Sequence, residues 1–239
     1  MSYFYPFPKT LYSFGDGEVA TIQNISLYAD IIDDIKNNGA FYQSYYIKTG
    51  ERPDNLAFKL YENAELHWLF YLMNDNIKNR GWPVTYNEVL EKCKIDFPGV
   101  VIRTHDNLAH KFKVGQNIKG NTSGARGTIV YRDLKLGHIV LDDVTGTFYS
   151  GELLTTRDNL AQTITSESVS PEHLAARYYI DSNGEIVDYD PFTGPGELIT
   201  KVTQLDYYVE QNDELRQIRV LKPAVANQVV QAFRDAMRS

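Results

Sequence analysis

The stretch RPDNLAFKLYENAELHWLFYLMNDN, residues 52–76, carries the clearest secondary-structure signals in the chain. Pro53 suits the first turn of a helix, and Asn63 suits the cap of a second helix. The spacing of the apolar residues predicts one buried face on each helix. These residues are Leu56, Ala57, Leu60 and Tyr61 in the first helix, and Leu66, Trp68, Leu69, Phe70, Leu72 and Met73 in the second. The stretch therefore predicts a hairpin of two helices joined by a short turn.

The segments around this hairpin have patterns of their own. Residues 3–23 are rich in aromatic residues, Pro and Gly, which indicates an extended or turning arm. Residues 25–35 place apolar side chains at near-helical spacing and predict a short helix. FYQSYYIKTG, residues 41–50, predicts a strand that leads into the hairpin. On the other side, Thr85 is expected to cap a helix over residues 86–94.

The period of the pattern changes in the middle of the chain. Between residues 109 and 156, short β-favouring runs alternate with turn formers and predict a small β-barrel or β-sandwich of four or five strands. Residues 157–172 are polar and rich in Ser and Thr, as in a linker. RYYIDSNGEIVDYD, residues 177–190, predicts a β-hairpin. An amphipathic helix is expected from about residue 224 to the end.

These elements predict an α+β fold that is assembled from several small modules. The expected segments are an N-terminal aromatic arm with a short helix over 1–39, a helical-hairpin domain over 40–104, an inserted small β-module over 105–160, and a hairpin, an extended segment and the C-terminal helix over 161–239.

Composition excludes several classes of protein. A net charge of −7 and a pI near 5.3 argue against a nucleic-acid binder, which needs surplus Lys and Arg to neutralise phosphates. We expect no signal peptide and no membrane span, because charged residues interrupt every apolar run. Cys93 is the one cysteine, which excludes an intrachain disulfide and a cysteine-based zinc cluster and fits a reducing compartment.

Few groups are arranged for catalysis. His105 and His110 lie five residues apart on an undefined element, which is a poor geometry for metal ligands, so a solvated loop is favoured. Cys93 stands between Lys92 and Lys94, which would lower the pKa of its thiol. A buried helix cysteine is the favoured interpretation, since free Cys packs as a small apolar group.

Glycine and acidic clusters also have ordinary explanations. GNTSGARG, residues 120–127, lacks the Lys-Ser/Thr ending of a phosphate-binding loop and is expected to be a hairpin turn. The acidic pairs at residues 33–34 and 142–143 stand beside turn formers, where Asp is favoured for backbone hydrogen bonding. We therefore predict no catalytic residue, no metal ligand and no cofactor.

Contact surfaces remain as the functional feature. Aromatic residues make up 13% of the chain, a composition that suits interfaces as well as cores. For Trp68 the favoured alternative is core packing, although large aromatic side chains often serve both roles. The predicted contact residues are Tyr3, Phe4, Tyr5, Phe7, Trp68, Tyr71, Trp82, Leu215, Ile218, Val225, Val229, Phe233 and Met237.

The Leu-Ala, Leu-x-Trp and Asn-Asp positions of the helical hairpin resemble the pattern of LysM modules, which are small βααβ units. YYIKTGERPDNLAFKLYENAELHWLFYLMNDN, followed by GW and later by NDELRQIRVLKP, resembles the baseplate wedge protein 53 family of contractile-tailed phages of the T-even type. The resemblance covers about residues 40–82 and 172–239. The module over about residues 105–160 departs from the family's pattern and resembles small β-modules of phage tail proteins.

The resemblance implies a non-enzymatic virion subunit that is assembled in the host cytoplasm. Such a subunit contacts other baseplate wedge proteins, clamps neighbouring wedges around the central tail hub, and is present in multiple copies per baseplate. Carried onto this chain, residues 45–76 would be the LysM-like contact unit and residues 213–238 the docking segment. No cofactor, nucleic acid or membrane is implied as a partner.

Two alternatives stay open. LysM modules of bacterial and phage enzymes hold N-acetylglucosamine polymers, so the hairpin could belong to a peptidoglycan-binding module of a tail or lysis protein. A peptidoglycan-degrading enzyme would need a general acid in an apolar pocket, for which Glu65 and Glu88 are the candidates. Surface positions on helices are favoured for both residues.

Overall fold

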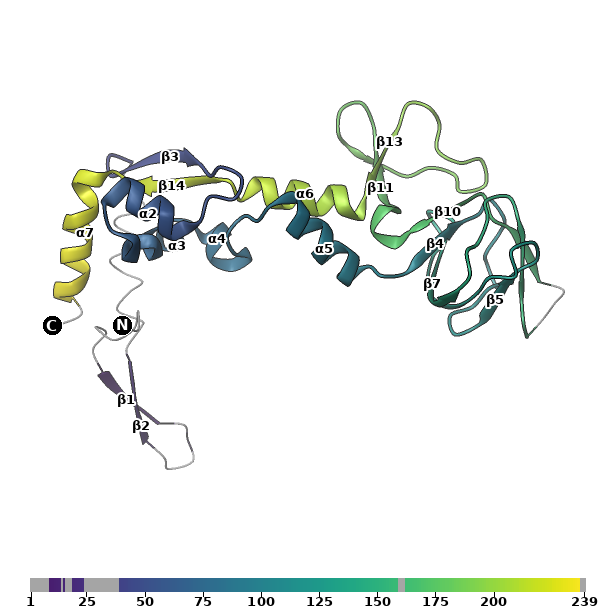
Figure 1. Ribbon diagram of the computed structural model, residues 1–239, viewed down its shortest axis with the longest axis horizontal. Helices are drawn as coiled ribbons and strands as arrows, with labels where there is room; N and C mark the ends of the chain where they lie inside the picture. Colours follow the sequence, from purple (N-terminus) through teal and green to yellow (C-terminus); the bar gives the residue numbers. More distant parts are fainter. Residues whose placement is uncertain (1–8, 14, 16–18, 24–38, 159–161, 237–239) are drawn as a thin grey trace. The chain divides into compact units, whose positions relative to one another are not determined.

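The computed structural model describes residues 9–13, 15, 19–23, 39–158 and 162–236. Helices and strands both contribute, so the predicted α+β class is confirmed. The chain divides into two compact units (Figure 1): unit 1 combines residues 1–84 with residues 213–239, and unit 2 is residues 85–212. The four predicted segments divide the chain differently, and their use as separate modules stays a prediction.

A short β-hairpin precedes the rest of the described chain. β1 (Lys9–Ser13) and β2 (Val19–Gln23) pair antiparallel and form a two-stranded sheet of their own. They lie in the stretch that is predicted as an extended or turning arm. The helix predicted over residues 25–35 lies outside the described residues.

The sheet of unit 1 joins two distant parts of the chain (Figure 1). β3 (Tyr42–Tyr46) lies where the sequence predicts a strand, and it pairs antiparallel with β14 (Gln217–Leu221). The strand that completes this sheet thus comes from the segment that the sequence predicts as extended. Strand pairing is a tertiary contact, and no local pattern specifies the partner.

The predicted helical hairpin is present. α2 (Pro53–Tyr61) begins with Pro53, and Glu62, in the left-handed region at φ 57°, follows its last turn. The second part begins as a tighter 3₁₀ turn, η1 (Ala64–His67), and continues as α3 (Trp68–Met73). The side chain of Asn63 accepts a hydrogen bond from the backbone N–H of Glu65 at 2.9 Å, as expected for a cap. A further short helix, α4 (Asp75–Arg80), follows.

Two clusters of buried side chains hold unit 1 together. The final helix, α7 (Pro223–Ala236), packs its apolar residues on the second half of the hairpin. That cluster contains Leu66, Leu69, Leu72, Met73, Leu221, Ala226, Val229 and Val230. The other cluster lies between the helices and the sheet and contains Ile47, Leu56, Ala57, Phe70, Ile77, Leu215, Ile218 and Val220.

Two helices of unit 2 share one apolar cluster. α5 (Tyr86–Asp96) begins with the predicted Thr85 cap, and Glu88 completes a capping box. α6 (Gln204–Glu214) corrects the prediction of an extended segment there. Thr203 and Asp206 form a reciprocal cap at its start, a local signal that was not used in the prediction. The Asp206 carboxylate accepts from the N–H of Thr203, and the N–H of Asp206 donates to the Thr203 hydroxyl. Leu205 of α6 packs with Val89 and Cys93 of α5.

The β-rich part of unit 2 is a seven-stranded sheet in the order β10-β4-β7-β6-β5-β8-β9. Its strands are β4 (Val100–Arg103), β5 (Asn117–Gly120), β6 (Arg126–Asp133), β7 (His138–Thr145), β8 (Leu153–Thr156), β9 (Thr163–Thr165) and β10 (Ser168–Pro171). The predicted hairpin turn over residues 120–127 joins β5 to β6. The prediction of a linker over residues 157–172 is wrong. Within this stretch, β9 pairs with β8, and β10 pairs with β4.

β9 and β10, which are neighbours in the sequence, therefore form the two opposite edges of the sheet. The apolar side chains of the strands meet in one buried cluster, which includes Ile102, Phe112, Ile118, Ile129, Ile139, Leu141, Phe148, Leu154 and Ile164. The sheet has more strands than the predicted four or five, because β4, β9 and β10 come from outside residues 105–160.

A second, smaller sheet of unit 2 has three strands in the order β12-β11-β13. β11 (Ala176–Ile180) and β12 (Ile186–Val187) form the predicted hairpin, and β13 (Thr200–Thr203) pairs with the other edge of β11. Asp181 holds the turn, because its carboxylate accepts from the N–H groups of Asn183 and Glu185. A 3₁₀ turn, η2 (Glu172–Leu174), connects β10 to β11.

Candidate interaction surfaces

The predicted contact residues Tyr71 and Trp82 lie together in unit 1 and are half-buried. Trp82 stacks obliquely on Phe70 and Tyr71, with ring centroids 5.8 Å and 6.0 Å away. Its Nε1–H donates to the carbonyl oxygen of Glu51 at 2.7 Å. Burial raises the pKa of the Tyr71 hydroxyl. Trp82 therefore ties the end of the helical region to the loop before α2.

Three other predicted contact residues are also packed within unit 1. Trp68 is half-buried against the cluster below α7. Leu215 and Ile218 are 6% and 2% exposed and pack with Phe70 and Leu56. In the free chain these side chains stabilise unit 1, as the alternative of core packing anticipated for Trp68. A role in partner contact stays a prediction for them.

The apolar stripe of the terminal helix packs at least partly on the same unit. Val229 is 6% exposed, and Val225 is half-buried against the cluster that contains Leu66 and Leu221. Met237, the side chain of Phe233, and the arm residues Tyr3, Phe4, Tyr5 and Phe7 lie outside the described part of the chain. The first two turns of α7 thus serve the fold of unit 1.

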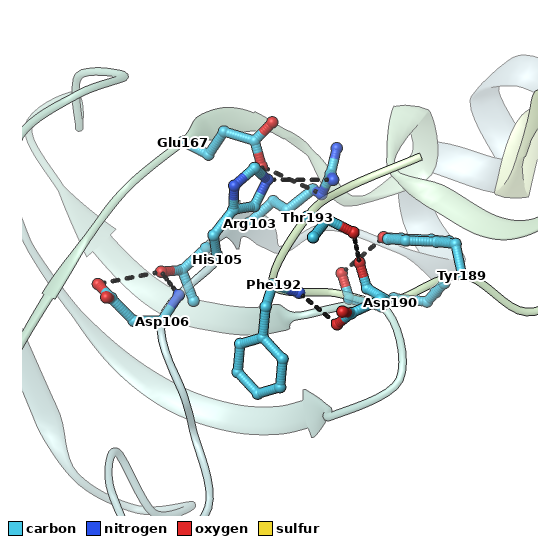
Figure 2. Close-up of polar contacts among 10 residues, drawn as sticks. Arg103, His105, Asp106, Glu167, Tyr189, Asp190, Phe192 and Thr193 are labelled. Atoms are coloured by element: carbon cyan, nitrogen blue, oxygen red, sulfur yellow. Dashed lines mark hydrogen bonds and ion pairs between the residues drawn. The ribbon is translucent and has the colours of Figure 1, made fainter. Parts of the chain in front are cut away.

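A charged cluster in unit 2 was not found from the sequence (Figure 2). The Glu167 carboxylate lies 3.2 Å from Nε of Arg103 and 2.6 Å from Nε2 of His105. The antiparallel pairing of β4 with β10 brings these groups together, because the N–H of Glu167 donates to the carbonyl oxygen of Arg103. No local pattern signals a pairing between residues so far apart in the chain.

A loop lies against this cluster. Gly194 has a φ of +81°, which favours glycine, and a Cβ atom at this position would lie 2.9 Å from Nη2 of Arg103. The Arg103 guanidinium also lies 5.4 Å from the ring centroid of Tyr189. Asp190 accepts from the N–H of Phe192 at 2.9 Å and shapes the turn between them (Figure 2). The contacts of Arg103 with Glu167 and Tyr189 therefore hold the loop that contains Gly194 against the sheet.

Beside this loop, unit 2 has a small apolar hollow of about 150 Å³. Its lining residues are Asp106, Asn107, Leu108, Ala109, Leu134, Gly137, Pro191 and Phe192. Phe192 and Leu134 are 53% and 51% exposed at its rim. The hollow is smaller than pockets that enclose small-molecule substrates, which measure about 300–1,000 Å³.

A comparison with known protein families gives a match that includes the helical hairpin. Residues 5–111 match the family described as base plate wedge protein 53. Over these residues the chain is similar to the base plate wedge protein 53 family. The match covers somewhat less than half of the 239 residues and includes β3, the hairpin helices and α5. The family resemblance is thereby confirmed for residues 40–82, and for residues 172–239 it stays a prediction. No curated protein matches the chain.

The match to this wedge family indicates a structural role in a phage baseplate. A baseplate wedge protein is a component of the virion tail and associates with other baseplate proteins. Every helix among the described residues is too short or too polar to span a lipid bilayer.

The cysteine and histidine candidates of the sequence take ordinary positions in the structure. Cys93 is 2% exposed, and burial, followed by the nearby charge of Asp96, raises the pKa of its thiol. A protonated, buried thiol is a poor nucleophile. Within the described ranges, His, Cys, Asp and Glu side chains form no group of three that could hold a metal ion. His105 bonds to Glu167 instead, and His110 lies on the exposed loop.

The two candidate general acids are surface residues of helix starts. Hydrogen bonds from the backbone and hydroxyl of Thr85 lower the pKa of the Glu88 carboxyl, whereas a general acid at neutral pH needs a raised one. Glu65 is exposed in the first turn after the Asn63 cap. Both positions support helix formation.

Proposed function

We propose that this wedge protein joins other wedge proteins of a contractile phage tail and clamps neighbouring wedges around the central hub. The observation that carries the proposal is the family match over residues 5–111. In this proposal, several copies act in each baseplate, and the baseplate is assembled in the host cytoplasm. The contacts are made by surfaces, with no chemical step.

The construction of unit 1 supports this proposal. The two sequence motifs that resemble the wedge family, one in the hairpin and one in residues 212–223, belong to the same unit, since β14 pairs with β3 and α7 packs on α3. The two motifs that resemble the wedge family therefore come together in unit 1. In our proposal it docks on the wedge core, and residues 45–76 serve as its LysM-like contact element.

The arm and the end of the terminal helix are the proposed docking segments. Phe233 follows Val225 and Val229 at helical spacing in α7. Phe233→Asp is expected to abolish co-elution with wedge partners, because it places a charge in the apolar stripe, while the melting temperature of unit 1 changes little.

The matched variant for this test is Val229→Asp, which places the same charge at a buried position of the same helix. It should unfold unit 1 as well as abolish docking. Normal assembly of the Phe233→Asp variant would show that the terminal helix is not the anchor. Unfolding of unit 1 by both variants would assign Phe233 to the core.

Co-expression tests the proposed function directly. The full chain is produced with the other predicted wedge proteins of its genome, and complexes are separated by size-exclusion chromatography and weighed by mass spectrometry. Stable co-elution at a defined stoichiometry is the expected result. A chain that stays monomeric in the presence of every wedge protein would overturn the proposal.

A second candidate function is peptidoglycan binding by a LysM-like module. The observation that favours it is that β3, α2, the η1–α3 segment and β14 occur in strand-helix-helix-strand order with antiparallel strands, with α4 and unit 2 inserted before β14. Sedimentation with purified peptidoglycan, run beside the co-expression test, separates the two candidates. Sedimentation without wedge binding would favour this second function.

A further inference from the structure

The turn between β11 and β12 contains an Asn-Gly pair, residues 183 and 184, at an exposed tip. Gly184 has a φ of +84°, which favours glycine, and a Cβ atom at this position would meet nothing within 4 Å. The chain's other Asn-Gly pair begins at residue 38, outside the described residues. Asn183 is therefore an exposed asparagine whose following peptide nitrogen is not shielded by a side chain.

The side chain of an asparagine can react with the peptide nitrogen that follows it. Here the nitrogen of Gly184 attacks Cγ of Asn183 and loses its proton, the bond from Cγ to Nδ2 breaks, and ammonia leaves with that proton. The product is a succinimide ring. Water then opens the ring at one of its two carbonyl carbons. Opening at Cγ gives aspartate, and opening at the backbone carbon gives isoaspartate, in which the chain runs through the side chain.

The hairpin has few contacts that keep it closed against this reaction. β12 has two residues, and its register with β11 consists of the pairs Tyr179–Val187 and Ile180–Ile186. Ile186 is 67% exposed. Segments with few buried apolar contacts open locally at a low free energy. The turn can therefore reach the geometry for ring closure without the unfolding of unit 2.

Asp181 restrains both reacting groups while the turn is closed. Its carboxylate accepts from the N–H groups of Asn183 and Glu185 at 2.8 and 3.0 Å, and from Nδ2 of Asn183 at 3.2 Å. Its carbonyl oxygen accepts from the N–H of Gly184 at 3.1 Å. The backbone hydrogen bonds from Glu185 and Asn183 lower the pKa of the Asp181 carboxyl, so this group is ionised at neutral pH. The reacting amide and the attacking nitrogen are thus both bound to Asp181.

We propose that Asn183 is a site of spontaneous deamidation through a succinimide, and that Asp181 is a positioning residue that sets its rate. The change is one-way because ammonia leaves. The new carboxylate faces the Asp181 carboxylate, to which the Asn183 amide donates before the reaction, and like charges at this distance repel. Isoaspartate also lengthens the backbone of the turn. Both products therefore loosen the β11–β12 hairpin, and the inference does not depend on the proposed function.

Peptide mapping by mass spectrometry tests the proposal. The full chain is incubated in mildly alkaline buffer, in which a peptide nitrogen loses its proton more readily, and samples are digested at acidic pH at intervals. We expect the peptide with Asn183 to exchange its NH₂ group for OH and to give both aspartate and isoaspartate. Asn121 is the internal control. It is exposed in the turn between β5 and β6, but Thr122 follows it and donates its N–H to Glu152, so it should stay intact.

Two variants of Asp181 test its role. Asp181→Ala removes the hydrogen bonds of the carboxylate and should accelerate the modification of Asn183 about tenfold, which corresponds to the loss of one or two net hydrogen bonds. Asp181→Asn keeps one acceptor oxygen and should accelerate it less. If circular dichroism shows that the Ala variant is unfolded, the Asn variant decides. Glu185→Gln is the matched control, because it removes the same charge beside the turn and leaves the Asp181 bonds in place.

Three results would overturn the inference. An Asn183 that reacts no faster than Asn121 would show that the closed turn protects it. Aspartate without isoaspartate would show that water attacks the side chain directly and that no ring forms. Rates that are the same in the native chain and in the folded Asp181 variants, or a Glu185→Gln variant that reacts as fast as Asp181→Ala, would show that the hydrogen bonds of Asp181 do not set the rate.

Discussion

Asn74→Ala is expected to destabilise unit 1 by about 3 kcal/mol. The substitution removes three hydrogen bonds, to the N–H of Arg219, to the carbonyl oxygen of Arg219 and to the carbonyl oxygen of Phe70. It leaves these buried or part-buried backbone groups without their side-chain partner, and each such group costs about 1–3 kcal/mol before the structure or water compensates. Asn74 therefore joins the end of α3 to the distant strand β14.

Tryptophan fluorescence measures this effect for unit 1 alone, because both tryptophans, Trp68 and Trp82, lie in that unit. Urea unfolding of the Asn74→Ala variant should show a lower midpoint with an unchanged slope. Asn79→Ala is the matched control, since Asn79 is an exposed residue of α4 and its loss should change the midpoint little. Equal midpoints for the two variants would contradict the strand-like role of Asn74.

Glu152→Gln is expected to destabilise unit 2 by a similar amount, about 3 kcal/mol. Glu152 is 4% exposed, and its carboxylate accepts from the N–H groups of Thr122, Ser123 and Tyr149 at 3.2, 3.0 and 2.7 Å. The hydroxyl of Ser123 donates to it as well, at 2.9 Å. A glutamine keeps the shape but turns an NH₂ group toward N–H donors, so two of these donors lose their acceptor.

The same carboxylate makes the stability of unit 2 depend on pH. Although burial raises the pKa of Glu152, the hydrogen bonds from Ser123, Tyr149 and Thr122 together lower it below the ordinary value of 4.5. A group with a lowered pKa in the folded state contributes stability above its unfolded pKa and loses it as the pH falls through the folded value. The difference in unfolding free energy between the native chain and Glu152→Gln should therefore be full at pH 7 and shrink below about pH 4.5.

Circular dichroism in urea measures the effect on the strands of unit 2, while tryptophan fluorescence reports unit 1 in the same samples. Glu197→Gln, at an exposed position of unit 2, serves as the control. A Glu152→Gln variant with a native midpoint at pH 7 would show that the carboxylate is not needed to hold its two loops. A shift of the fluorescence transition as well would show that the two units unfold together.

Local signals account for most of the helices. Pro53 and the Asn63 and Thr85 caps mark helix starts within a few residues of where they occur, because capping involves groups that are neighbours in the chain. The missed helix α6 also has a local signal, the reciprocal hydrogen bonds of Thr203 and Asp206. It was overlooked because its apolar spacing lies within a stretch rich in Tyr and Val, which also favour strands.

The interaction surfaces were harder to predict. An aromatic residue in a sequence has the same composition signal whether it lies in a core or at an interface. Trp82 is fixed by a hydrogen bond to Glu51, and Ile218 by burial under the helices, so both support the fold of unit 1 in the free chain.

The amino-acid sequence by itself determined the α+β class, the helical hairpin, the hairpin turns and the wedge-family resemblance, because these depend on periodicity, caps and motifs within short stretches. Only the tertiary structure decided that β3 pairs with β14, that residues 163–171 provide both edge strands of the large sheet, and that Asn74 takes the place of a strand. Each of these is a pairing of backbone groups far apart in the chain. Every peptide unit offers the same donor and acceptor, so the choice of partner rests on the packing of the whole unit.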